Sequence, residues 1–247
     1  MTGHDGVVVL ILGIETATER IGVAVIGSDG VVAAFEATRG RHHAEIVMPA
    51  IEFVCRNGGV SVDELSAIAV DIGPGLFTGM RVGLATGQAM AQALDVPMVA
   101  VTSLETLAYS VRHTDAVIAS VVDARKGQVF FGFHHATGDG VVSAGESRAG
   151  SVADLIAAIE DRGQRALCVG DGTVRYREDL AGHTLIDIAD RHHAYPSVHN
   201  VAIIAMRRAL REQWSSPTDI RAMYLRAPDA EINWSTRDSS PPAVVQP

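Results

Sequence analysis

Four residues at the start of one predicted helix, His42-His43-Ala44-Glu45, carry the side chains best suited to hold a metal ion. A metal site on one helix takes two ligands a turn apart, because side chains at positions i and i+4 share a face. His42 and His43 are adjacent, so they point about 100° apart, and neither has a histidine four positions later. Two interpretations of His42 and Glu45 stay open: they could form a metal-ligand pair, or both could simply be surface residues at the start of the helix. His192-His193 is adjacent too, in a predicted loop, and we predict no metal site.

A second set of residues has the chemistry to surround phosphate. A nucleotide site between two lobes needs two loops rich in exposed backbone N–H groups and a carboxylate to order magnesium. Glu15-Thr16-Ala17-Thr18 offers a carboxylate and two hydroxyls. The second loop would be Asp123-Ala124-Arg125, which lacks the expected glycine and threonine, although Arg125 could contact an anion. Gly170-Asp171-Gly172 follows a predicted strand, at the position where two-lobed nucleotide-binding folds contact the adenine base. We predict a vestigial nucleotide site made of Glu15, Thr16, Thr18, Asp123, Arg125, Gly170 and Gly172.

Other catalytic patterns are missing from the sequence. Gly73-Pro74-Gly75 precedes a predicted helix, but it has neither the Lys-Ser/Thr of a P-loop nor GxGxxG spacing, which favours a structural turn. No GxSxG elbow occurs, and no paired-carboxylate motif stands out. We therefore predict no catalytic residue and no cofactor of the chain's own.

Composition and charge limit the class of protein. The 247 residues are 47% apolar and 20% charged, which suits one large domain or two modest lobes. The apolar run at residues 7–14 is far shorter than the roughly 20 residues of a membrane-spanning helix, and the N-terminus lacks a basic secretory leader. We expect a cytoplasmic protein without membrane contact, in which Cys55 and Cys168 are core residues.

The net charge of −9 opposes nucleic-acid binding, which depends on basic side chains that displace counterions. One basic cluster, Arg207, Arg208 and Arg211, lies near the end of a predicted helix, and we interpret it as a solvated face. Any contact with RNA is then local or made through a partner.

Apolar periodicity and turn residues predict alternating strands and helices. Ser103 is expected to cap one helix, and Ser151 with Asp154 forms a capping box for another. Pro49 lies inside the first helix, which either starts near it or bends there. The predicted strands are 7–14, 21–26, 31–37, 68–72, 97–101, 117–123, 128–133 and 166–170, and the predicted helices are 43–57, 77–94, 103–111, 151–161 and 197–213.

The helix over residues 77–94 carries Gly79, Gly83 and Gly87 at positions i, i+4 and i+8. These glycines form a smooth stripe that another backbone could approach closely, at a cost of roughly 1 kcal/mol each relative to alanine. Packing on the chain's own sheet would explain the stripe, and so would a four-helix contact with a homologous partner. The predicted interface residues are Pro49, Ile51, Gly79, Met80, Gly83, Leu84 and Gly87.

The order of elements repeats once, since each half opens with a strand hairpin and continues with alternating strands and helices. This pattern predicts an α/β fold of two duplicated lobes, the two-lobed actin-like ATPase fold with a degenerate nucleotide site. We place lobe I at residues 8–112, lobe II at 113–196, and a mobile tail at 228–247. The helix at 197–214 is expected to pack back on lobe I.

Four segments in order resemble the bacterial TsaB (YeaZ) family from about Val9 to Glu231. The first segment is Ile11-Leu12-Gly13-Ile14-Glu15-Thr16-Ala17-Thr18, and the second is Gly73-Pro74-Gly75-Leu76-Phe77-Thr78-Gly79-Met80-Arg81-Val82-Gly83. The third is Val122-Asp123-Ala124-Arg125-Lys126-Gly127-Gln128-Val129-Phe130, and the fourth is Met223-Tyr224-Leu225-Arg226 followed by Pro228-Asp229-Ala230-Glu231. Glu15 departs from the family, whose members usually carry aspartate there.

The resemblance implies a non-catalytic subunit in tRNA modification. Such a subunit binds the larger homologue TsaD as a heterodimer and is required when TsaD transfers threonylcarbamoyl to the adenosine beside the anticodon. The ATPase TsaE joins them, ATP or ADP can bind in the complex, tRNA is met indirectly, and a homodimer forms when the chain is alone. Two alternatives stay open: a free-standing actin-fold ATPase or small-molecule kinase, and a glycoprotease-like metallopeptidase.

Overall fold

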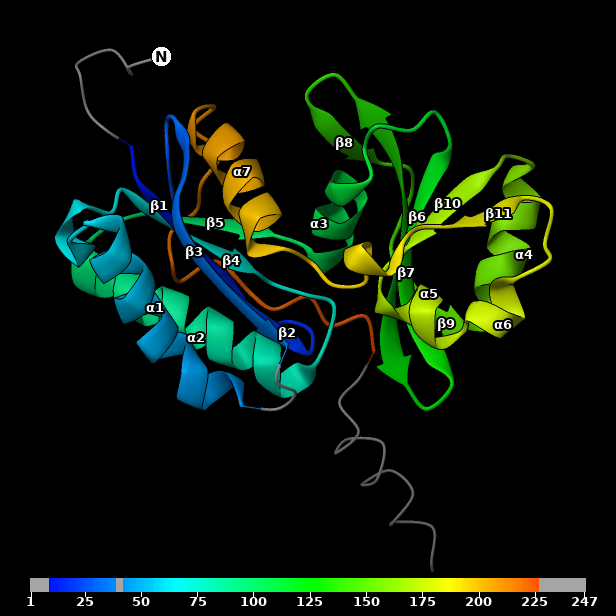
Figure 1. Cartoon of the computed structure of the whole chain (residues 1–247), viewed down its shortest axis with the longest axis horizontal. Coiled ribbons are helices and arrows are strands. Elements are labelled where there is room, and N and C mark those ends of the chain that lie inside the picture. The colour runs from blue at the N-terminus through cyan, green and yellow to red at the C-terminus, as the bar shows by residue number, and fades with distance from the viewer. Residues whose placement is uncertain (1–8, 39–41, 227–247) are drawn as a thin grey trace, which may run out of the picture.

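The computed structural model describes residues 9–38 and 42–226, which form two α/β lobes side by side (Figure 1). The strands are β1 (Ile11–Glu15), β2 (Arg20–Gly27), β3 (Gly30–Thr38), β4 (Ala67–Asp71), β5 (Met98–Val101), β6 (Val117–Arg125), β7 (Gln128–Thr137), β8 (Gly140–Ser143), β9 (Arg148–Ser151), β10 (Ala166–Val169) and β11 (Ile186–Ile188). The α-helices are α1 (His43–Gly58), α2 (Phe77–Leu94), α3 (Ser103–Ser110), α4 (Val152–Arg162), α5 (Asp171–Arg175), α6 (Arg177–Leu180) and α7 (Val198–Ala209), with short 3-10 turns at Val62–Glu64 and Arg191–His193.

The first lobe is built on a sheet in the order β3-β2-β1-β4-β5. β1 to β3 are antiparallel neighbours, whereas β4 and β5 continue in parallel with β1. Successive side chains of a strand point to opposite faces of the sheet, so each apolar strand contributes side chains to the core on either face. Figure 1 shows α1 and α2 along one face of this sheet and α7 across the other.

The second lobe repeats the same arrangement. Its sheet runs β11-β10-β6-β7-β8, with β6 to β8 antiparallel and β10 and β11 parallel to β6. In each lobe the first three strands form a meander and two later parallel strands extend the sheet on the other side of the first strand, while β9 pairs with β7 as an addition in the second lobe. Helix α4 covers one face and α3 the other. This duplicated topology confirms the two-lobed actin-like α/β fold.

The predicted boundaries hold best where a turn or cap is strong. Helix α2 spans 77–94 as predicted, α1 runs without interruption through Pro49, and Ser151 and Asp154 form their capping box. Helix α3 is capped one residue earlier than predicted, because the hydroxyl of Thr102, rather than that of Ser103, accepts a hydrogen bond from the Glu105 amide.

The last helix is shorter than the sequence predicted. Helix α7 ends at Ala209, before the predicted residue 213, and Glu212 adopts a positive φ that no helix continues through. The same helix packs on the sheet of the first lobe. The predicted tail at 228–247, and the signature residues Pro228 to Glu231, lie outside the described residues. Among the described helices, none is long and apolar enough to cross a membrane.

Candidate functional site

The loop after β1 lies buried under the start of α2. Glu15 and Thr16 are fully buried, and the Thr16 hydroxyl donates a hydrogen bond to the Gly79 carbonyl across 2.8 Å. The Ala17 carbonyl accepts a bond of 2.7 Å from the Leu76 amide. His43 is also buried, and its Nε2 lies 2.8 Å from the Thr18 carbonyl. The Thr16 hydroxyl is therefore already engaged within the chain, whereas the buried Thr18 hydroxyl has no hydrogen-bond partner among the described residues.

The glycine stripe of α2 faces this loop and the sheet beneath it. Gly79, Gly83 and Gly87 are all buried. A Cβ on Gly79 would overlap the Thr16 carbonyl oxygen, a Cβ on Gly83 would overlap the Thr16 hydroxyl, and one on Gly87 would meet the Val70 side chain. The helix backbone thus sits directly on β1 and β4, and side chains cannot fit between them. This geometry favours the alternative in which the glycines allow close packing inside the chain, and their part in a partner interface stays a prediction.

Two carboxyl groups meet beneath the same loop. Glu15 ends β1 and Asp71 ends the neighbouring parallel strand β4, and both are fully buried. Glu15 Oε1 accepts a 2.8 Å bond from the Ala17 amide, while Asp71 Oδ1 accepts from the Gly73 amide at 2.7 Å and the Ser103 hydroxyl at 2.9 Å. The other oxygen of each carboxyl, Glu15 Oε2 and Asp71 Oδ2, accepts no hydrogen bond from an amide or hydroxyl of the described residues, which leaves the two carboxyls to each other.

Burial and proximity explain how this pair holds a proton. Loss of solvation raises the pKa of Glu15 well above its usual value, and the neighbouring Asp71 raises it further. Burial also raises the pKa of Asp71, to about 6, against the lowering effect of its hydrogen bonds from Glu15, Gly73 and Ser103. The arrangement is that of a protonated Glu15 donating to an Asp71 carboxylate. Sequence reasoning missed this pair, although its signal was available: both residues close adjacent, wholly apolar strands.

A cluster of charges joins the two lobes. Arg125, at the end of β6, reaches Glu19 of the first lobe at 2.6 Å and Asp123 of its own strand at 3.1 Å. Arg175 lies 3.5 Å from the same Asp123 carboxylate, and the Tyr195 hydroxyl donates to Glu19 at 3.4 Å. These contacts raise the pKa of Arg125, chiefly through its bond to Glu19, so the guanidinium stays charged. A phosphate entering here would have to displace Glu19.

The backbone at Arg125, in the turn between β6 and β7, has an unusual conformation. Arg125 and Lys126 both have positive φ values, of 65° and 54°, ahead of Gly127 in the β6–β7 turn. Positive φ is strained for residues other than glycine, and such strain is typical of sites where geometry matters. The sequence predicted a tight connection here but gave no signal that Glu19 would be the partner across the lobes.

The glycines proposed to meet adenine pack against the second sheet instead. A Cβ on Gly170 would overlap the Val121 carbonyl, and one on Gly172 would meet the Val121 side chain. Gly172 lies within α5, so the predicted short turn after β10 is the start of a helix. Between them, Asp171 accepts a 2.9 Å bond from the Asp123 amide, and burial raises its pKa to about 6. The structure thus brings Asp123, Arg125 and Asp171 together, while Gly170 and Gly172 serve close packing.

Among residues 9–38 and 42–226, no three histidine, cysteine or acidic side chains converge as a metal site would require. His42 pairs instead with Glu45, as Nδ1 to Oε2 at 3.0 Å on the surface. Cys55 and Cys168 are free and buried, as predicted from the sequence. The absence of a functional metal remains a prediction.

A separate feature lies on the outer side of α1 and α2. A groove of about 780 Å³ is lined mostly by apolar side chains from the middle of α1, the end of α2 and the segment after α1. Met48, one of its lining residues, is 52% exposed. The lining residues are Met48, Pro49, Ile51, Glu52, Cys55, Arg56, Val60, Ser61, Val62, Met90, Ala93 and Leu94.

Only part of the predicted interface reaches this groove. Pro49 and Ile51 line it, whereas Met80 is 3% exposed and packs toward Gly73. Leu84 is half-buried against the core under α1 and α2. Sequence reasoning missed Met48 and Met90, because a helical apolar stripe does not tell which of its edges stays exposed.

Comparisons with known proteins agree with this architecture. Residues 31–234 match the family model described as TsaD, tRNA N6-adenosine threonylcarbamoyltransferase. The chain is 30% identical over 228 residues to the tRNA threonylcarbamoyladenosine biosynthesis protein TsaB of Bacillus subtilis, covering 91% of this chain and 97% of that protein.

A second relative and a solved structure extend the comparison. A tRNA N6-adenosine threonylcarbamoyltransferase of Novosphingobium aromaticivorans is 40% identical over 124 residues, covering 42% of this chain and 35% of that protein. The chain therefore matches about a third of that transferase's length. A crystal structure from Pseudomonas aeruginosa, described as similar to the peptidase YEAZ, aligns with a TM-score of 0.76 at 24% identity, over 88% of this chain and 100% of that chain.

Proposed function

This chain belongs to the TsaB family of tRNA threonylcarbamoyladenosine biosynthesis proteins, and from that premise we propose that it acts as an accessory subunit that binds a TsaD-type transferase. In this role the chain supplies a docking surface and catalyses no step itself. The transferase partner moves threonylcarbamoyl to the adenosine beside the anticodon, and the ATPase TsaE joins the complex.

The observation that carries this proposal is the exposed apolar groove along α1 and α2. Burying Met48, which lines the groove and is about half exposed, would remove apolar surface from water, worth roughly 25 cal/mol per Å². A contiguous patch of exposed apolar side chains often marks a site of interaction with another protein. A solvated helix face would carry polar side chains at these positions.

The occupant we propose is the matching pair of helices in the homologous transferase. The chain and the Novosphingobium aromaticivorans transferase share 40% identity over 124 residues, so the partner is expected to present a related apolar face. Two such faces would form a four-helix contact of roughly 1,600 Å² in total, the usual size of a specific interface. The same surface can pair with a second copy of this chain when the transferase is missing.

The hydrogen bonds within the predicted nucleotide site support a role without turnover. The Thr16 hydroxyl is bonded to Gly79, and the Arg125 guanidinium to Glu19 and Asp123. In the assembled complex, we expect the partner subunits to make most of the contacts to nucleotide. We expect the transferase to make most of the contacts to tRNA.

The experiment compares a groove variant with a matched control elsewhere. Met48→Glu places a charge in the groove, and Val142→Glu places the same charge on β8 of the second lobe, where Val142 has the same 52% exposure. Association with the TsaD-type protein of the same source is measured by isothermal titration calorimetry. We expect Met48→Glu to weaken binding at least tenfold, which is about 1.4 kcal/mol, and Val142→Glu to leave it unchanged. Equal binding by both variants would refute the docking surface.

Gly83 is unsuitable for this test. A larger side chain there would overlap Thr16 inside the chain and disturb the first lobe before it reached any partner. Met48 points to solvent, so its replacement leaves the core unchanged.

A further inference from the structure

A group of basic side chains surrounds Tyr109 where α3 and α7 of the two lobes meet. The Arg112 guanidinium carbon lies 4.1 Å from the centre of the Tyr109 ring, and that of Arg207 lies 5.5 Å from it. Arg112 also donates a 3.0 Å bond to the Tyr109 carbonyl. The ring itself is 2% exposed, so it forms a fixed support for both guanidinium groups. We call Arg112, His113, Arg207 and Arg211 the Tyr109 patch.

The charges of this patch are incompletely balanced. Arg208 is neutralised by both oxygens of Glu105, each at 2.7 Å. Arg211 reaches the Asp139 carboxylate at 3.1 Å, while Arg207 bonds only to the Asp139 backbone carbonyl. Within the described part of the chain, no carboxylate forms an ion pair with Arg112 or Arg207. Two held guanidinium groups thus keep their charge in a chain of net charge −9.

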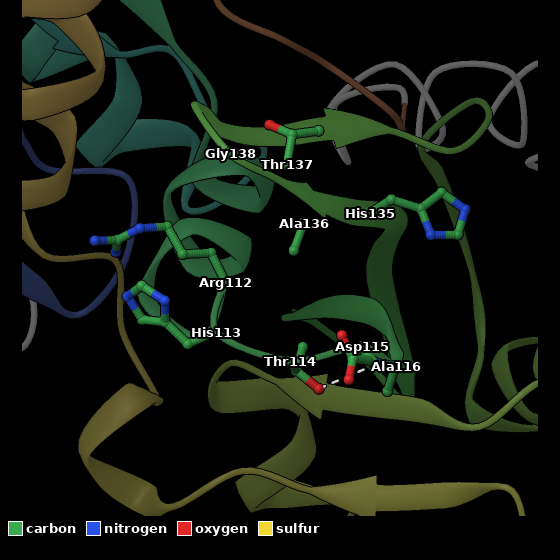
Figure 2. Close-up of a pocket in the computed structure, with 9 residues that line it drawn as sticks. All are labelled: Arg112, His113, Thr114, Asp115, Ala116, His135, Ala136, Thr137 and Gly138. Carbon is green, nitrogen blue, oxygen red and sulfur yellow. Dashed lines mark hydrogen bonds between the residues drawn. The ribbon is translucent and has the colours of Figure 1, made fainter.

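The surface beside these arginines is hollowed and polar. One hollow of about 380 Å³ is lined by residues 112–116 and 135–138. Figure 2 shows Arg112 and His113 on one side of it and His135 on the other. A second hollow of about 180 Å³ is lined by Tyr109, Arg207 and Arg211 among others. Arg112 thus borders one hollow and Arg207 the other, and both guanidinium groups contact the same ring.

We propose that the Tyr109 patch binds the phosphate backbone of RNA. Guanidinium groups match phosphate oxygens with paired hydrogen bonds, and groups already held by stacking lose less freedom on binding. Uncompensated arginines beside polar hollows fit a chain of phosphates, because such contacts position a nucleic acid without reading its sequence. The inference rests on the proposed function for the identity of the RNA, a tRNA, and it adds a direct contact to the indirect one expected from the sequence.

The test uses the full chain and a fluorescein-labelled, unmodified tRNA transcript. Fluorescence anisotropy gives the dissociation constant from about 25 to 200 mM KCl, for the chain alone and with saturating TsaD-type protein. The variants are Arg112→Ala/Arg207→Ala and, independently, Arg211→Glu at an exposed position after α7. The control is Arg165→Ala, an exposed arginine paired with Asp187 near the opposite edge of the second sheet. Circular dichroism confirms that each variant is folded.

We expect the double variant to lower the slope of log affinity against log salt by about 1 to 2, since each lost phosphate contact removes about one unit. Arg211→Glu is expected to weaken binding and Arg165→Ala to leave it unchanged. Equal slopes for the wild type and both patch variants would overturn the proposal. So would a loss of transferase binding with RNA binding intact, because the patch would then contact protein. Calorimetry with the transferase separates these outcomes from a failure of the proposed function itself.

Discussion

Replacing Glu15 by glutamine should change how the stability of this protein depends on pH. Glu15 is fully buried beside Asp71, and its raised pKa means that the folded protein keeps a proton that the unfolded chain releases above about pH 4.5. Folded protein then binds more protons than unfolded protein, so the free energy of unfolding falls as pH rises. The loss is about 1.4 kcal/mol per pH unit for one proton, and it continues up to the pKa of Glu15 in the folded state.

The Glu15→Gln variant isolates this effect. The amide keeps the shape of the side chain, accepts from the Ala17 amide and donates to Asp71, but it carries no titrating proton. Below pH 6.5 other buried groups also titrate: burial lowers the pKa of His134 to about 4, so its stability contribution rises with pH. Above pH 6.5, we expect Glu15→Gln to gain on the wild type by about 1.4 kcal/mol per pH unit until Glu15 ionises.

The assay is urea unfolding followed by circular dichroism at half-unit steps from pH 6.5 to 9. Glu52→Gln, a change at an exposed position of α1, is the control and should run parallel to the wild type. Parallel curves for Glu15→Gln and the wild type would refute the reasoning, because they would show that folded Glu15 holds no extra proton in this range.

Three further predictions follow from the same packing and charge contacts. Gly83→Leu should lower the free energy of unfolding by about 3 kcal/mol or more in urea titrations, because any side chain there overlaps Thr16; a loss below about 0.5 kcal/mol would contradict the close packing. Arg125→Ala should cost about 1 kcal/mol at low salt and less at high salt in thermal unfolding, since its pair with Glu19 is partly exposed; a cost independent of salt would argue against a cross-lobe ion pair. Cys168, whose pKa is raised to about 12 by burial, should react with a thiol reagent only on unfolding, and rapid labelling of native protein would contradict its placement.

The sequence predicted the fold well because the signals were local and repeated. Helix α2 begins after the turn at Gly73-Pro74-Gly75, and its residues 77–94 carry an uninterrupted helical pattern. The duplicated meander was visible in the turns at Gly30 and Gly127. The strands β8 (Gly-Val-Val-Ser) and β9 (Arg-Ala-Gly-Ser) were missed because neither carries the apolar run that marks the equally short β5 and β10.

The site was harder to predict because it depends on contacts between distant residues. The glycine stripe gave two alternatives, and only the position of Thr16 beneath it shows that the stripe faces inward. Glu15 and Asp71 lie far apart in sequence and meet because β1 and β4 are neighbours. Likewise, nothing in the spacing of Glu19 and Arg125 indicates that they pair across the lobes.

Reconstituted transfer of threonylcarbamoyl to tRNA tests the proposed accessory role most directly. Product is measured with the chain alone, with the TsaD-type protein and TsaE alone, and with all three together, using wild-type chain and Met48→Glu. We predict product only when all three are present, and a large loss with Met48→Glu that Val142→Glu does not cause. Transfer by the chain alone, or full transfer without it, would contradict the proposed role.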